Sequence, residues 1–195
     1  MSRTTESALA VRSTLRADLN AVPEDARTVP NLADRLITLA AEDERLTREA
    51  LELPGAVYRR EAAVRCRIDH GRVLREIVDA SGWPSCSAVG EAASIAAVQI
   101  LLHSGDLELM SSCQERIASA VEAKASPAIH LAYVEDACAV LQGRRQKYGT
   151  QIDPKLLRPY PIEDPERVGE RRQEVGLPPL REVVEHHLGL LKQAQ

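Results

Sequence analysis

One stretch of the chain, residues 89–102, is nearly free of charge and rich in small apolar side chains. Glu91 is the only charged residue in it, and His103-Ser104-Gly105 follows directly. A helix that is apolar on nearly all sides must be surrounded by other elements. The sequence therefore predicts a buried central helix from Val89 to His103, against which the other elements pack.

Apolar residues recur every three or four positions along most of the remaining chain, a spacing typical of amphipathic helices. Asp106 and Ser126 are expected to cap two of these helices. Leu53, Val64 and Ile68 belong to the expected inward stripes. The predicted helices cover residues 1–22, 32–53, 57–80, 107–123, 126–142 and 180–191, with a short charged helix after Asp164-Pro165.

The fold class that these patterns predict is all-α, because alternating strand patterns are lacking. We expect a single compact domain over residues 1–195, with about seven or eight helices. An extended proline-rich segment should precede the C-terminal helices. The helix at 1–22 could be peripheral, and the tail at 152–195 should pack on the domain.

The amino-acid composition indicates what the core is made of, and the net charge excludes some classes of binding partner. Apolar residues make up 44% of the chain and aromatic residues only 3%, with no Phe, so the core must consist of Leu, Val, Ile and Ala. The net charge of -4 and the pI near 5.8 argue against binding to nucleic acids or anionic membranes. No signal peptide or membrane span is apparent. We expect a cytoplasmic protein.

The polar segment Gln146–Gln151 carries amides, a phenol and a hydroxyl, with Gly149 to allow a tight turn. Such a segment cannot serve as core, so it is a candidate binding loop. The alternative is a loop that uses the same hydrogen bonds to hold the tail against the helices.

His103 ends the apolar helix, where the helix dipole favours the protonated imidazole and burial favours the neutral one. It is a candidate acid or base, or else a cap for the last carbonyl groups of the helix. Asp136 shares a helix face with Tyr133 and needs a buried partner. That partner could be His103, Arg144 or main-chain amides of the following loop, the last being a structural anchor.

These residues predict one pocket in which His103 is the general acid or base and Asp136 orients it. Tyr148 would donate a hydrogen bond to developing negative charge. The catalytic residues expected are His103, Asp136 and Tyr148, and the substrate-binding residues expected are Trp83, Tyr133, Gln146, Thr150 and Gln151.

Neither a metal ion nor an organic cofactor is expected. The four cysteines (Cys66, Cys86, Cys113 and Cys138) lack C-x-x-C spacing, and nucleotide-binding and hydrolase motifs are absent from the sequence. Adjacent His186 and His187 point in different directions on a helix. A site formed by His103 with Asp106 or Asp136 is the remaining possibility for a metal.

Several motifs together resemble one bacterial family, the domain-of-unknown-function family 6624. They are Gly82-Trp83-Pro84, Val89-Gly90, His103, Gln114, Ala132-Tyr133 with Asp136, Gln146-x-Tyr148-Gly149-Thr150-Gln151, Pro161-Ile162-Glu163-Asp164-Pro165, Arg171-Arg172 and Val175-Gly176-Leu177-Pro178. The resemblance covers residues 32–188 and implies no particular reaction. This chain departs from the family pattern at Leu102, Ala137 and Gly169.

The function expected is that of a small-molecule enzyme of specialised metabolism, of hydrolase, lyase or cyclase type, working without a nucleotide cofactor. The alternative is a non-catalytic module that binds a ligand or regulates another protein through the polar loop. A third possibility is a structural partner that forms homo-oligomers through the helix at 1–22.

Overall fold

The computed structural model describes residues 31–53, 55–154, 156 and 158–185. The predicted helix at 1–22 and the end of the predicted C-terminal helix lie outside these residues. The described chain is all-α with one very small sheet, which confirms the predicted fold class.

The helices are α2 (Leu32–Glu52), α3 (Val57–Ser81), α4 (Cys86–Val89), α5 (Glu91–Ser104), α6 (Leu107–Glu122), α7 (Ala128–Leu141) and α8 (Val168–Glu174), with the 3-10 turn η1 (Pro165–Arg167) before α8. Residues 180–185 are also helical. Strands β1 (Ile152–Asp153) and β2 (Arg158–Pro159) pair antiparallel, with Ile152 opposite Pro159. This hairpin interrupts the segment that we expected to be extended.

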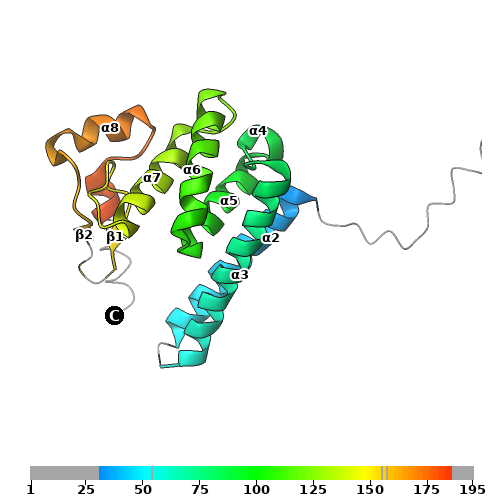
Figure 1. The fold of residues 1–195 in the computed structure, drawn as a ribbon. Helices are drawn as coiled ribbons and strands as arrows, with labels where there is room; N and C mark the ends of the chain where they lie inside the picture. Colours follow the sequence, from blue (N-terminus) through cyan, green and yellow to red (C-terminus); the bar gives the residue numbers. More distant parts are fainter. Residues whose placement is uncertain (1–30, 54, 155, 157, 186–195) are drawn as a thin grey trace, which may run out of the picture. The chain divides into compact units, whose positions relative to one another are not determined.

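The predicted central helix is α5, which contacts α2, α3, α4, α6 and α7 (Figure 1). Its buried positions include Ala97 and Leu101, both fully inaccessible to solvent. Small residues let the neighbouring helices approach closely, while Leu and Ile fill the spaces between them. The helix is not covered on all sides, because Ile95 is 49% exposed. In the described part of the chain no helix has the length and hydropathy that a membrane span requires.

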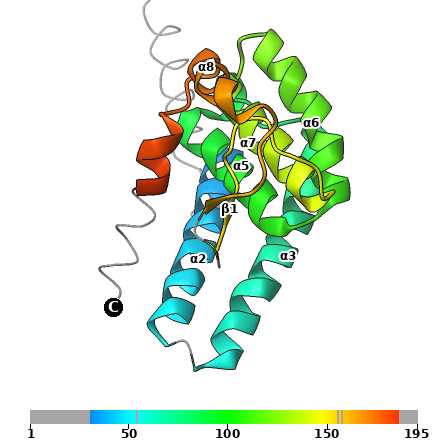
Figure 2. The ribbon, with the colours of Figure 1, turned by 90° about the vertical axis from the view of Figure 1, so that its left-hand side faces the viewer.

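Three positions of the predicted apolar stripes are not inward. Leu53, Val64 and Ile68 are each about half exposed. Figure 2 shows that one end of the α2–α3 pair extends past the other helices, so fewer elements can cover apolar side chains there. Periodicity identifies the apolar face of a helix, but it does not show where the covering helix ends.

One of the two predicted caps is confirmed and the other is wrong. The Asp106 carboxylate accepts a hydrogen bond from the Leu109 amide and caps α6. Ser126 does not cap α7, because Pro127 occupies the N-cap position. The Ser126 hydroxyl instead accepts a hydrogen bond from the amide of Cys86, which begins α4. Ser126 therefore joins two elements distant in sequence.

Close packing of α3 on α5 depends on Gly71. A Cβ placed on Gly71 would lie 2.8 Å from the Cβ of Ser104. We expect Gly71→Ala to destabilise the protein by about 1–3 kcal/mol, because this overlap outweighs the higher helix propensity of Ala.

The matched control is Gly169→Ala in α8, where nothing lies within 4 Å of an added Cβ. That variant should gain up to about 1 kcal/mol from helix propensity. Urea unfolding of both variants measures the difference. Equal effects of the two substitutions would contradict the close packing.

A buried histidine on α7 predicts acid sensitivity. His130 is 5% exposed, and its Nδ1 has no hydrogen-bond partner among the residues that the structure describes. Burial lowers the pKa of His130 from the ordinary value of 6.5. Since the unfolded chain then binds the proton more readily than the folded one, stability is lost as pH falls through and below 6.5. His130→Leu should reduce this loss between about pH 7.5 and pH 5 in urea unfolding. An unchanged pH dependence in the variant would contradict the assignment.

Candidate functional site

The residues predicted to form one pocket belong to separate hydrogen-bond networks. Asp136, Gln146, Tyr148, Thr150 and Gln151 come together where the loop after α7 folds back on that helix. His103 bonds instead to Asp43 on α2. The structure therefore brings most of the predicted binding residues together but does not pair His103 with Asp136.

Asp136 anchors the loop and is fully inaccessible to solvent. Its Oδ1 accepts hydrogen bonds from the amides of Lys147, at 2.7 Å, and Tyr148, at 3.0 Å. Its Oδ2 accepts from the Thr150 amide at 2.8 Å and the Thr150 hydroxyl at 2.9 Å. A buried carboxylate requires such compensation. Of the partners considered from sequence, the main-chain amides are the ones that Asp136 uses.

Gln146 is equally buried, and its side chain forms hydrogen bonds to the backbone of two separate segments. Its side-chain amide donates to the carbonyls of Gln151 and Tyr160, and its side-chain oxygen accepts from the Gln151 amide. Its own backbone bonds to Pro161 and Glu163. These contacts hold the tail against the loop, as the structural alternative for this segment predicts.

Arg172 completes the network from α8 and is 2% exposed. It donates to the carbonyl of Tyr148 and to the carbonyl of Pro178, each at 2.7 Å. Burial lowers the pKa of Arg172 from its usual value, with nearby Tyr133 and Asp136 acting in the opposite direction. The guanidinium thus links the loop, α8 and the segment that follows α8.

The predicted aromatic residues have packing contacts. Tyr148 packs with Ala132 and Leu177 in a small apolar cluster, and Tyr133 lies at its edge. The Lys147 ammonium lies 5.0 Å from the centre of the Tyr148 ring. Trp83 is in the main helical core, separate from that cluster. Trp83 precedes α4 and is far from the loop in sequence. The fold does not bring it into the cluster that contains Tyr148.

Gly149 allows this packing in two ways. Its φ of +73° favours glycine, and an added Cβ would lie 2.8 Å from Ile162. The loop therefore has the close backbone approach predicted for Gly149, but toward its own tail.

A hollow of about 230 Å³ lies beside the loop on its outer side. Side chains of both charge signs line it, and Asp136 is among them. The lining residues are Gln114, Glu135, Asp136, Ala139, Arg144, Arg145, Lys147 and Glu163. Hydrogen bonding to Tyr148 and the charge of Glu135 raise the pKa of Lys147, so its ammonium is charged at neutral pH. This hollow could hold a small polar or anionic ligand.

His103 lies at the C-terminal end of α5, where its Nδ1 faces the Asp43 carboxylate. The Asp43 side chain is 5% exposed, whereas the His103 side chain is 41% exposed. Arg67 of α3 donates to Asp43 at 2.7 Å and also to the hydroxyl of Thr47. Three helices therefore contribute to one network with a buried carboxylate and an accessible imidazole.

The charge of Asp43 is stabilised by its partners. Burial by itself would raise the pKa of Asp43. Hydrogen bonds from His103 and Arg67, together with their charges, outweigh burial and hold the pKa below its usual value. Asp43 therefore remains ionised and can accept a hydrogen bond from His103.

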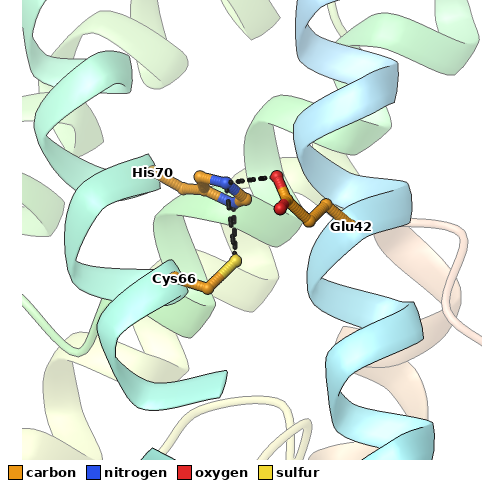
Figure 3. Close-up of side chains that lie close together, drawn as sticks. All are labelled: Glu42, Cys66 and His70. Atoms are coloured by element: carbon orange, nitrogen blue, oxygen red, sulfur yellow. Dashed lines mark hydrogen bonds and ion pairs between the residues drawn. The ribbon is translucent and has the colours of Figure 1, made fainter. Parts of the chain in front are cut away.

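A second cluster lies beside this network, between α2 and α3 (Figure 3). Cys66 and His70 are one helical turn apart on α3 and face Glu42 of α2. Burial, aided by the charges of Glu42 and Asp43, raises the pKa of the Cys66 thiol to about 11. The Cys66 thiol is therefore protonated at neutral pH when no metal is bound. A protonated thiol is a poor nucleophile.

Sequence reasoning missed Asp43, Arg67 and the Glu42–Cys66–His70 cluster. The Cys-x-x-x-His spacing of Cys66 and His70 was a usable signal, because residues four apart share a helix face. Nothing local pointed to Glu42 or Asp43, which are acidic residues in an amphipathic helix. Their partners are distant in sequence.

The fold and the loop define a helical domain whose C-terminal tail is held by buried polar side chains. The chain belongs to the family of unknown function DUF6624, whose model matches residues 32–194. This confirms the resemblance seen in the motifs. No curated protein matches the chain, and no solved structure matches it either.

The anchoring role of Asp136 predicts a large effect on stability. Asp136→Asn should destabilise the protein by roughly 2–4 kcal/mol, because the new amide group cannot accept all the buried donors. Glu135→Gln is the control, since its partner Lys147 lies 4.0 Å away and the pair is partly exposed. That control should cost about 0–1 kcal/mol in urea unfolding. If Asp136→Asn is as stable as the control, the carboxylate does not anchor the loop.

Proposed function

We propose that this protein is a small-molecule enzyme in which His103 transfers protons and Asp43 orients it. One observation carries the proposal: a buried, ionised carboxylate bonds one nitrogen of a half-exposed histidine. This arrangement differs from the one expected from sequence, in which Asp136 was to orient His103.

The geometry suits general acid–base catalysis. With Nδ1–H donating to Asp43, the Nε2 atom has no hydrogen-bond partner among the described residues. Nε2 can accept a proton from a substrate or water and later return it to a leaving group. The Asp43 carboxylate holds the ring through Nδ1, while Arg67 and Thr47 keep the carboxylate in place. Asp43 is a positioning residue, because it acts through His103.

Proton transfer of this kind fits a hydrolase, lyase or cyclase. A role in specialised metabolism of a bacterium, in the cytoplasm and without a nucleotide cofactor, remains part of this proposal. So does homo-oligomer formation through residues 1–22. The contacts of Asp136 and Tyr148 within the loop give these two residues an anchoring role, so the proposal assigns them no proton transfer.

A second candidate function is ligand binding without turnover. The hollow beside the loop favours it, because Arg144, Arg145 and Lys147 line one small space. These cations would bind a carboxylate or phosphate group. The anchored loop would then present a rigid binding surface rather than a catalytic one.

The test compares the wild-type chain with His103→Gln on a small-molecule extract of the source organism, followed by mass spectrometry. Glutamine keeps a donor for Asp43 but cannot shuttle protons. We expect the wild type to consume at least one compound, with turnover about 10²–10⁴-fold lower in the variant. Gln99→Ala is the matched control, one turn earlier on α5, where Gln99 bonds the exposed Glu44.

Turnover that His103→Gln leaves unchanged would contradict the proposal. A compound that the wild type retains without converting, and that Lys147→Ala releases, would favour the binding function instead. Thermal midpoints of all variants separate these effects from unfolding.

A further inference from the structure

Glu42, Cys66 and His70 place three different ligand types at one point between α2 and α3 (Figure 3). Their sulfur, nitrogen and oxygen atoms all lie within 4.8 Å of one another. Neither the acid–base network nor the anchored loop uses these side chains. We propose that this cluster is a binding site for a divalent transition metal of the zinc type.

The distances between the ligand atoms support the proposal. In a tetrahedral zinc site with bonds of about 2.3 Å to sulfur and about 2.0–2.2 Å to nitrogen and oxygen, the ligand atoms lie roughly 3.4–3.6 Å apart. In this cluster His70 Nε2 lies 3.5 Å from Cys66 Sγ and 3.3 Å from Glu42 Oε2. The same sulfur also lies 3.5 Å from Nδ1, so it faces the plane of the ring. A metal ion bound to both residues therefore requires the imidazole to turn until Nε2 points between Cys66 and Glu42, while the side chains stay at about their present separations.

The helical backbone of α2 and α3 places the three side chains close together. Cys66 and His70 are four positions apart on α3, so both side chains leave the same face of that helix. Glu42 approaches from the neighbouring helix α2. The metal would thus join two helices that already pack together, and the ligands come from regular elements rather than from a loop.

Charge and donor type select the class of metal. A thiolate and a carboxylate would balance the charge of a divalent cation, with His70 binding as a neutral imidazole. Sulfur and nitrogen donors favour zinc and similar ions, whereas calcium and magnesium require mostly oxygen. Metal binding displaces the thiol proton outright.

The site has an open side. His70 has a side-chain exposure of 9%, while Glu42 has 48%. With three protein ligands, a fourth position facing solvent can hold water or an oxygen of a small molecule, which distinguishes this site from closed structural zinc sites. This differs from the expectation of no metal, and it involves neither His103 nor Asp136. The site stands independently of the proposed acid–base function.

The test is titration of the full chain, freed of metal, with Co²⁺ as a spectroscopic substitute for Zn²⁺. We expect one equivalent to bind with a thiolate-to-cobalt charge-transfer band, and Zn²⁺ to remove that band by displacing the cobalt. Cys66→Ser should abolish the band, His70→Gln should abolish binding, and Glu42→Gln should weaken it. Circular dichroism checks that each variant keeps its helical content.

Two controls make the result specific. Cys86→Ser removes another partly buried cysteine and should leave the band unchanged. Replacing both His186 and His187 by Asn removes the remaining histidine pair and should also leave binding unchanged. The proposal is overturned if no cobalt binds, if the band persists in Cys66→Ser, or if binding is lost with His186 and His187 alone.

Discussion

The burial of carboxylates is the constraint on which the described structure depends. Taken as whole residues, Asp43 and Asp136 are exposed by no more than 3%, and each ionised group must recover the hydration it has lost. Asp136 recovers it from main-chain amides and one hydroxyl, which positions the loop and hence the tail. Asp43 recovers it from a guanidinium and an imidazole, which ties α2 to α3 and α5. The contacts of Asp136 fix the backbone of the loop. The contacts of Asp43 leave the imidazole ring of His103 partly exposed to solvent.

The helices and the position of the polar loop could be predicted because their signals are local. A stripe repeats every turn, and Gly143 ends α7 with a left-handed conformation just before the loop. Even the partner of Asp136 was among the alternatives, since the loop begins soon after the helix that carries Asp136. The chain needs no long path to bring these groups together.

The partner of His103 could not be predicted in the same way. Asp43 is 60 residues away in sequence and lies on a helix whose other acidic residues are exposed or partly exposed. Which acidic residue is buried depends on the rotation of α2 against α5, and amphipathic periodicity defines that rotation only coarsely. The half-exposed Val64 and Ile68 show a related limit, because periodicity does not show where the covering helices end.

The α2–α3 pair connects the proposed metal site and the proposed acid–base residue. Glu42 and Asp43 are consecutive on α2, and Cys66 and Arg67 are consecutive on α3. Neighbouring side chains on a helix point in different directions, so each pair serves two clusters at once. A shift of one helix along the other would disturb both clusters together.

The way in which Asp136 holds its loop has a consequence for the residues within that loop. The carboxylate binds amide groups of the main chain, which every residue except proline provides. The side chain of Lys147 is thus not needed for the anchor and instead lines the neighbouring hollow. A different side chain at position 147 would change the charge that lines this hollow, while the main-chain amide that Asp136 holds would remain. The buried aspartate thus fixes the course of the loop without fixing the side chains that the loop carries.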